Sequence, residues 1–217
     1  MHDDTTDESP KNEILLLSFN NGRDQNPISL SLYTDASPGC GGIAWPAGQI
    51  LSNYIVKRGS EFLQNRTVVE LGSGTGLVGL VAGKLGARVW ITDQTQMLGI
   101  MHKNIKMNNL ESCVSVAELN WGIDLPSNVP RPDIILAADC VYFEPAFPLL
   151  VQTLADLADQ STEILFCYKK RRKADKRFFS FLKKHFSWED VTDDPDRKIY
   201  NREGISLLRF HKTTRGS

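Results

Sequence analysis

Residues 68–80 read VVELGSGTGLVGL, and the four glycines at positions 72, 74, 76 and 79 leave few folds open to this chain. The β-branched run before them is typical of a strand, and the apolar run from Leu77 to Leu85 is typical of a helix. Glycine weakens regular structure, so such a cluster marks a sharp turn or a close approach of the backbone to another group. A strand, a glycine loop and a helix N-terminus in this order form a nucleotide-binding turn, which predicts an α/β fold.

Chain length and composition indicate one globular domain. The 217 residues are enough for an α/β domain with a substantial core. Hydrophobic residues make up 41% of the chain and charged residues 24%, which are ordinary values. The formal net charge of -1 gives no general argument for binding to nucleic acid or to a membrane surface. The chain contains no run of 18 apolar residues, so we expect no membrane-spanning helix.

Two further features bear on the compartment. Residues 1–12 are acidic and polar, unlike a secretory signal or a transit peptide, so we interpret them as a disordered lead. The cysteines at 40, 113, 140 and 167 form no C-x-x-C pair and do not cluster with the four histidines. This pattern predicts no metal site, and it favours unpaired buried thiols in a reducing compartment, which we take to be the cytoplasm.

Beyond the lead, residues 13–217 read as a single domain. Residues 13–62 form a small extension with two short strands, EILLLSFN and ISLSLYTD, and a helix from about Ala47 to Arg58. Residues 63–212 form the core. No internal repeat and no linker rich in glycine or serine divides the chain further.

Strand-like and helix-like segments alternate through the core. The predicted strands lie at 67–71, 88–92, 114–118, 133–137 and 163–167, and the predicted helices at 77–85, 95–108, 146–157 and 174–185. This alternation is typical of a doubly wound, Rossmann-like sheet that is mostly parallel. The segments 187–192 and 204–210 have no predicted helix between them. We expect them to complete a seven-stranded sheet as an antiparallel C-terminal hairpin at its edge.

The glycine pattern alone leaves the class of cofactor open. Gly74–Gly79 fits G-x-G-x-x-G, which is typical of proteins that bind NAD or FAD. The glycines also begin one step earlier, at Gly72, shortly after Glu70. Asp93 ends the next predicted strand, where it can accept hydrogen bonds from ribose hydroxyl groups. S-adenosylmethionine and the dinucleotides both contain a ribose, so Asp93 does not discriminate between them.

Three features disfavour a dinucleotide. Glu70 ends the first core strand, where dinucleotide-binding folds tend to carry an apolar residue. Trp121 follows the third core strand, where it can stack on or wall in an adenine. After the fourth strand come Asp139, Tyr142 and Glu144, at the edge of the sheet where a substrate enters. No second substrate domain follows, as most dehydrogenases need.

Six stretches together resemble one family of enzymes: GGIAWPAG, VVELGSGTGLVGL, VWITDQ, LNWG, DIILAADCVYFEP and CYKKRRKADKRFF. The chain resembles the seven-β-strand methyltransferases that use S-adenosylmethionine. More narrowly, it resembles the protein-lysine methyltransferases of the methyltransferase-like 21 and fungal elongation-factor group. The resemblance spans residues 41 to about 180, nearly all of the fold. LNWG departs slightly, because the family often has an aspartate where Asn120 stands.

The resemblance implies a set of cofactor-binding residues and a pair of catalytic ones. The cofactor-binding residues lie in the glycine loop or in segments expected beside it: Trp45, Glu70, Gly72, Ser73, Gly74, Asp93, Trp121 and Ala138. Asp139 and Tyr142 are the implied catalytic residues, because a carboxylate and a phenol can align an amine and stabilise the charge that develops on its nitrogen. Core packing is the alternative for Trp45 and for Trp121. Helix capping is the alternative for Asp93, and helix or loop capping is the alternative for Asp139.

The resemblance also implies a reaction and its partners. It implies methyl transfer to a lysine ε-amine of a folded protein. The favoured substrate is a translation elongation factor of the 1-alpha type, and a chaperone or an AAA ATPase is the second choice. We expect a monomer. RNA or a small molecule as acceptor, a dinucleotide-dependent oxidoreductase and a non-catalytic binding module are the alternatives. Enzymes that methylate the amino groups of bases often carry Asn/Asp-Pro-Pro-Tyr/Phe after the fourth strand, whereas residues 139–142 read Asp-Cys-Val-Tyr.

The one strong charge run is YKKRRKADKR at residues 168–177, and it allows three interpretations. It can bind nucleic acid, form a docking patch for an acidic partner or begin a solvated helix. Aromatic side chains that would stack on bases are not interleaved through the run. We therefore favour docking or plain solvation over nucleic acid.

Overall fold

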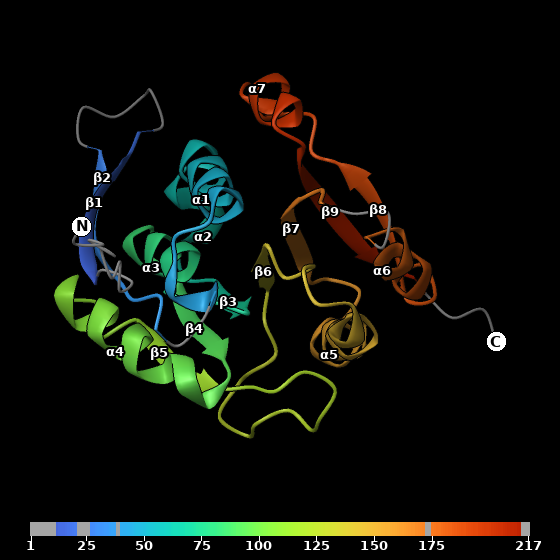
Figure 1. Ribbon diagram of the computed structural model, residues 1–217, viewed down its shortest axis with the longest axis horizontal. Helices are drawn as coiled ribbons and strands as arrows, with labels where there is room; N and C mark the ends of the chain where they lie inside the picture. The colour runs from blue at the N-terminus through green and yellow to red at the C-terminus, as the bar shows by residue number, and fades with distance from the viewer. Residues whose placement is uncertain (1–11, 21–26, 38–39, 172–174, 214–217) are drawn as a thin grey trace, which may run out of the picture.

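A seven-stranded sheet forms the centre of the computed structural model, which describes residues 12–20, 27–37, 40–171 and 175–213. The strand order is β5-β4-β3-β6-β7-β9-β8 (Figure 1). The strands are β3 (Thr67–Leu71), β4 (Arg88–Asp93), β5 (Val114–Glu118), β6 (Ile134–Ala138), β7 (Glu163–Lys169), β8 (Phe186–Asp190) and β9 (Ile205–Lys212). The strands from β3 to β7 pair in parallel, and β9 pairs antiparallel with β7 and β8. The predicted fold class is therefore confirmed.

Helices cover both faces of this sheet (Figure 1). The helices are α1 (Pro46–Arg58), α2 (Ser60–Leu63), α3 (Leu77–Lys84), α4 (Leu98–Met107), α5 (Phe147–Leu157) and α6 (Asp175–Leu182), with short 3-10 turns at Cys40–Gly42, Thr95–Met97 and Glu144–Ala146. Side chains of α1, α3 and α4 form one core cluster, and side chains of α5 and α6 form the other. In β3, Val68 packs in the first cluster and Val69 in the second, because successive strand residues point to opposite faces.

The antiparallel pair at the edge of the sheet has the predicted strands but a different connection. β8 and β9 pair from Phe186↔Lys212 to Asp190↔Leu208. A short helix, α7 (Arg197–Arg202), lies between them, so the expectation of no helix there is wrong. This helix has 6 residues, too few to show a helical period in the sequence, and Tyr200 is its one buried residue.

The N-terminal extension forms a separate antiparallel sheet of two strands, β1 (Glu13–Phe19) and β2 (Ile28–Thr34). Asn104 of α4 and Asn108, which directly follows α4, hold the edge of β2 that β1 leaves free. The Asn104 side chain accepts a hydrogen bond from the Tyr33 N–H at 2.7 Å and donates one to the Tyr33 carbonyl at 3.0 Å. Asn108 bonds the N–H and carbonyl of Ser31 in the same way, at 3.0 and 2.8 Å. These side chains replace the neighbouring strand that an edge strand lacks.

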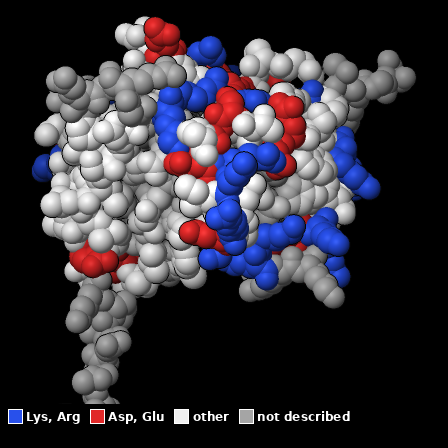
Figure 2. Space-filling view, turned by 90° about the horizontal axis from the view of Figure 1, so that it is seen from above, with Lys and Arg blue, Asp and Glu red and all other residues white. Residues whose placement is uncertain are grey.

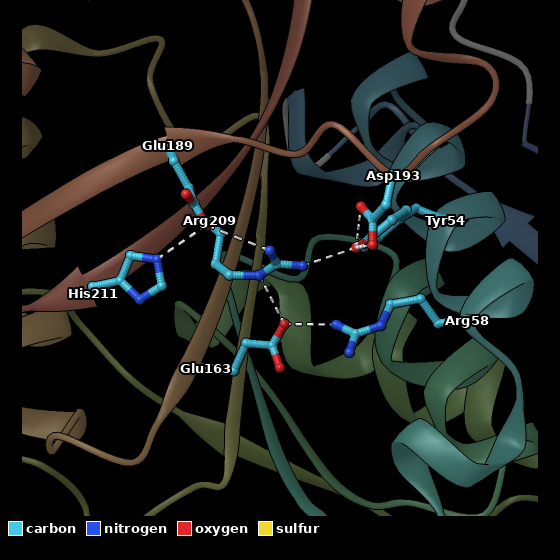
Figure 3. A network of polar contacts seen from close by, with 7 residues as sticks. All are labelled: Tyr54, Arg58, Glu163, Glu189, Asp193, Arg209 and His211. Carbon is cyan, nitrogen blue, oxygen red and sulfur yellow. Dashed lines mark hydrogen bonds and ion pairs between the residues drawn. The ribbon is translucent and has the colours of Figure 1, made fainter.

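A polar network joins α1 to the last strands of the sheet (Figure 3). Glu163, at the start of β7, accepts hydrogen bonds from Arg58 of α1 at 2.6 Å and from Arg209 of β9 at 3.1 Å. Arg209 also donates to the Tyr54 hydroxyl at 3.1 Å, and that hydroxyl donates to Asp193 at 3.1 Å. Burial raises the pKa of Tyr54 to about 12, so the hydroxyl keeps its proton. Figure 2 shows acidic and basic side chains lying side by side on the face seen from above.

The sequence also led to expectations about membrane-spanning helices, metal sites and cysteines. No helix in these residues is long and apolar enough to cross a membrane. No three His, Cys, Asp or Glu side chains among them are placed to hold a metal ion. All four cysteines are free; Cys140 and Cys167 are buried and Cys113 is partly buried, but Cys40 is exposed, so the expectation of buried thiols is wrong for Cys40. Residues 1–11 of the predicted lead lie outside the described residues.

Candidate active site

The glycine loop follows β3 and is packed from two sides. Gly72 has φ of 59°, and a Cβ there would lie 2.9 Å from the Trp121 ring and 3.0 Å from the Cys140 sulfur. Gly74 has φ of 54°, and a Cβ there would collide with the carbonyl oxygen of Gly41. Only glycine tolerates both the positive φ and the closeness of these neighbours. The loop therefore lies between the segment before α1 and the segment after β5, which is where the sequence predicts the walls of the cofactor site.

Glu70, in β3, forms hydrogen bonds to the glycine loop and to the first turn of α3. Its side chain is buried, and one carboxylate oxygen accepts a hydrogen bond from the Gly79 N–H, in the first turn of α3, at 2.9 Å. The Ser73 hydroxyl donates to the Glu70 carbonyl at 3.1 Å. Burial raises the pKa of Glu70 to about 8, although the Gly79 hydrogen bond opposes this rise. These bonds give Glu70 a structural task at the helix N-terminus, and its contact with a cofactor stays a prediction.

Asp93 ends β4 and bonds directly to the glycine loop. One carboxylate oxygen accepts from the Gly74 N–H at 2.8 Å, and the other accepts from the Gln94 N–H at 2.7 Å. Neither N–H belongs to α4, which begins at Leu98, so the carboxylate orders the loop rather than capping that helix. Burial raises the pKa of Asp93. Each oxygen keeps a further lone pair, so a ribose diol can still bind there.

The two predicted tryptophans differ in their surroundings. Trp45 immediately precedes α1 and is 37% exposed, which argues against the core-packing alternative. Its indole N–H donates to the Cys40 carbonyl at 2.8 Å, and its ring lies 5.4 Å from the guanidinium carbon of Arg171. Trp121 is half-buried and packs against the second core cluster as well as beside Gly72. It therefore combines packing with a place next to the loop.

Asp139 directly follows β6 and is held by an arginine that the sequence analysis did not single out. Its carboxylate accepts two hydrogen bonds from Arg171, at 2.7 and 2.6 Å, and the Lys169 N–H lies 3.3 Å from it. Asp139 is buried and has φ of 58°, which is uncommon for a residue with a side chain. None of these bonds reaches the helix that follows, so they do not support helix capping, whereas the bond from the Lys169 N–H fits the loop-capping alternative. Backbone strain at such a position often marks a functional site.

A second arginine of the basic run reaches the same loop. Arg177 of α6 forms an ion pair with Glu144, five residues after Asp139 in the chain. Arg171 and Arg177 of the basic run therefore attach the segment after β7 to the loop after β6, a role that neither docking nor solvation describes for these two residues. Both loops follow neighbouring parallel strands, so adjacency of β6 and β7 was the one signal that could have pointed to these pairs. Residues 172–174 of the run lie outside the described residues.

Ala138 and Tyr142 flank the acid on the same rim. Ala138 is the last residue of β6 and is partly buried, opposite Cys167 of β7. Tyr142 is 54% exposed, so its ring is open to an incoming substrate. Burial of its hydroxyl raises the pKa of Tyr142, and the negative charge of Asp93 adds to the rise. The phenol therefore stays protonated near neutral pH.

A buried thiol lies beside the glycine loop, next to Gly72. Cys140 is buried and its thiol donates to the Leu71 carbonyl at 3.3 Å. Burial raises the pKa of Cys140 well above its usual value, and the charges of Asp93, Asp139 and Glu70 raise it further. The thiol is thus no candidate nucleophile.

Comparison with known proteins points to one family. A family model described as lysine methyltransferase matches residues 24–185. The chain is 38% identical over 199 residues to the protein-lysine N-methyltransferase EFM6 of Saccharomyces cerevisiae, covering 79% of this chain and 81% of that protein. It is 38% identical over 165 residues to the protein N-lysine methyltransferase METTL21A of Xenopus tropicalis, covering 75% of this chain and 76% of that protein.

Solved structures share the fold at low sequence identity. The 16S rRNA N2 G1207 methyltransferase RsmC of T. thermophilus, solved in complex with AdoMet and guanosine, has a TM-score of 0.63 and 18% identity. That match covers 93% of this chain and 51% of the RsmC chain. The ribosomal protein L11 methylase of Lactobacillus delbrueckii subsp. bulgaricus has a TM-score of 0.57 and 16% identity, covering 79% and 81% of the two chains.

Proposed function

Because this chain belongs to the lysine methyltransferase family, we propose that it methylates a lysine of a translation elongation factor of the 1-alpha type. The chain is an S-adenosylmethionine-dependent methyltransferase that acts on protein lysines. The observation that carries the proposal is the buried carboxylate of Asp139, which two hydrogen bonds from Arg171 hold in place. It lies at the C-terminal edge of the parallel strands, the same edge from which the glycine loop leaves β3. The resemblance to the fungal elongation-factor group supports the choice of this substrate.

S-adenosylmethionine, when bound, supplies a methyl group carried on a positively charged sulfur. We infer that the backbone of the glycine loop lines its methionine part, because the loop has no side chain at Gly72 or Gly74. Asp93 then binds the ribose hydroxyl groups. Trp121 lies against the adenine, and Trp45 covers the cofactor from the side of the N-terminal extension. The remaining inferred contacts are Glu70, Ser73 and Ala138.

Asp139 and Tyr142 act on the lysine side chain. A lysine must lose its proton before its nitrogen can attack a methyl group. While the lysine is still charged, the acids of the loop after β6 attract it. Asp139 aligns the amine and balances the positive charge that develops on nitrogen. The protonated Tyr142 phenol offers an oxygen that accepts a hydrogen bond from the amine. Positioning and partial desolvation supply most of the rate enhancement.

We further propose that the enzyme works as a monomer in the cytoplasm. The unpaired cysteines support a reducing compartment, and the proposed substrate is a cytoplasmic translation factor. The pairs Arg171–Asp139 and Arg177–Glu144 complete the candidate site within one chain, so a second copy is not needed to build it.

The test is methyl transfer from tritiated S-adenosylmethionine. Two acceptors are offered: elongation factor 1-alpha made in bacteria, and a protein lysate from cells that lack this gene. Wild type is compared with Asp139→Asn and Tyr142→Phe, and S-adenosylhomocysteine binding is measured by calorimetry for each. We expect label on a lysine of the elongation factor, identified by mass spectrometry, and its loss in Asp139→Asn with cofactor binding retained.

Other outcomes change specific parts of the proposal. Label on a chaperone or an AAA ATPase in the lysate, with none on the elongation factor, would show that the proposed substrate is wrong and that the proposed reaction, lysine methylation, is right. Label in RNA or small molecules alone overturns the assignment of the acceptor. Full activity of Asp139→Asn overturns the role given to that carboxylate.

A further inference from the structure

A groove opens next to the candidate acceptor site, on the side of the sheet that α6 covers. Its volume is about 830 Å³, and it lies between α6 and the strands β8 and β9, which are neighbours in Figure 1. Arg171 lines this groove and also donates both hydrogen bonds to Asp139. One side chain therefore separates the groove from the carboxylate that is proposed to receive the lysine.

The floor of the groove is aromatic. Tyr168, Phe179 and Trp188 line it, and the Phe179 ring lies 5.5 Å from the Tyr168 ring and 5.0 Å from the Trp188 ring. Trp188 is 38% exposed, so a partner can reach its face. An exposed tryptophan beside a partly buried phenylalanine in a concave site is a typical anchor for a large apolar side chain of a partner.

The charges of the groove leave a positive surplus. Three acids line it too. Asp175 is buried and accepts a hydrogen bond from the Arg171 N–H at 2.9 Å, Glu189 pairs with Arg209, and Asp190 pairs with Arg197. Lys170 and Lys176 are exposed at the groove, and neither side chain forms an ion pair with a described residue. These two ammonium groups are therefore free to meet an acidic partner.

We propose that this groove binds the segment of the protein substrate that flanks the acceptor lysine. The segment carries a large apolar side chain, which packs on Phe179 and Trp188, and acidic side chains, which pair with Lys170 and Lys176. The proposal rests on protein-lysine methylation at Asp139. It explains how one lysine is selected although lysines are common on every protein surface. The groove binds the residues that flank the lysine, and Asp139 binds its amine.

Charge reversal tests this docking without touching the acceptor site. Lys170→Glu is combined with Lys176→Glu, and the matched control combines Lys183→Glu with Lys198→Glu, which make the same change in charge at exposed positions outside the groove. The probe is desalted protein lysate from cells that lack this gene, offered at increasing concentration with tritiated S-adenosylmethionine. Affinity for S-adenosylhomocysteine and thermal unfolding show whether each variant is folded.

We expect the groove variant to lose about tenfold in kcat/KM through a higher KM, with the same maximal rate and cofactor affinity as wild type. The control stays within about twofold of wild type. Added salt is expected to raise the KM of wild type more than that of the groove variant. Trp188→Ala is expected to raise KM as well.

The outcomes separate the two proposals. If wild type labels protein lysines and the groove variant keeps the wild-type KM, the docking inference is wrong and the proposed function stands. If the control loses as much kcat/KM as the groove variant, overall charge rather than the groove attracts the substrate, and the inference fails. If wild type labels no protein lysine, the proposed function fails, and the docking inference fails with it.

Discussion

Asp139 depends on Arg171 for both its geometry and its charge. The carboxylate is buried at a residue with positive φ, and the two Arg171 bonds are its shortest contacts. We expect Arg171→Ala to lower the free energy of unfolding by about 2 kcal/mol, because a buried carboxylate loses its cation, which is itself partly exposed. We also expect kcat to fall at least about tenfold as Asp139 leaves its position, with unchanged affinity for S-adenosylhomocysteine. Chemical denaturation, initial rates and calorimetry measure the three quantities.

A second arginine of the same run provides the control. Arg177 pairs with Glu144, but its side chain is 71% exposed. Arg177→Ala should change stability by less than about 0.5 kcal/mol, because exposed ion pairs contribute little. Equal effects of the two substitutions on kcat would mean that the basic segment acts by its charge alone.

Glu70 makes stability depend on pH. The ordinary pKa of its carboxyl is 4.5, and burial raises the pKa to about 8 in the folded protein. Between these values the folded state binds more protons than the unfolded state. The stability from the protonated carboxyl is therefore fully present below the unfolded pKa and is lost as the pH rises through the folded pKa. Glu70→Gln keeps an oxygen for the Gly79 N–H but cannot ionise.

We therefore expect the thermal midpoint of wild type to fall more than that of Glu70→Gln between about pH 5.5 and about pH 8.5. Circular dichroism at several pH values measures the difference between the two curves. Parallel curves for the two proteins would show that Glu70 does not titrate in this range.

Single residues show how far the sequence reaches at this scale. Glu70, Asp93 and Trp121 were found from their places at strand ends, and the structure puts each beside the glycine loop. Arg171 was not found, because a cation in a basic run carries no sign of which acid it meets. That partner lies 32 residues away in the chain and becomes a neighbour only when β6 and β7 pair.

At the scale of elements, the glycine loop is the least tolerant to change. We expect Gly74→Ala to destabilise the protein by about 1–3 kcal/mol, because alanine there adopts a positive φ and its Cβ collides with Gly41. The loop must also shift, so affinity for S-adenosylhomocysteine should fall. Gly99→Ala is the matched control: Gly99 lies in α4 with nothing within 4 Å of an added Cβ. It should stabilise the helix by up to about 1 kcal/mol. A stable Gly74→Ala with normal affinity would contradict the fit of the loop.

The strands of the parallel sheet were predicted better than the last helices of the chain. The strand expected at 114–118 has the predicted bounds, because its pattern and its neighbours agree. The helix expected at 174–185 ends earlier, at Leu182, and α7 was missed altogether. Packing on the rest of the protein, through Tyr200 in the case of α7, decides such short helices, and the sequence does not display that packing.

At the scale of the whole molecule, the N-terminal extension and the cofactor loop share a support. The Asn104 side chain bonds the backbone of Tyr33 in β2, and it also donates to the Thr75 carbonyl in the glycine loop at 2.9 Å. Asn104 is fully buried. In the sequence, a polar residue inside an amphipathic helix is typical of its solvated face, so nothing in the pattern singles Asn104 out. The two-stranded sheet of the extension is thus linked to the loop through the amide group of Asn104.

This connection predicts different results for two similar asparagines. Asn104→Ala and Asn108→Ala each leave β2 backbone groups without partners, so both should lose about 2–4 kcal/mol of stability. Only Asn104 also holds Thr75, so only Asn104→Ala should weaken S-adenosylhomocysteine binding at temperatures where both variants are folded. Denaturant unfolding and calorimetry measure the two effects. Equal affinity in both variants would mean that the extension stabilises the fold without shaping the cofactor loop, whereas a loss confined to Asn104→Ala would make the extension part of the binding site.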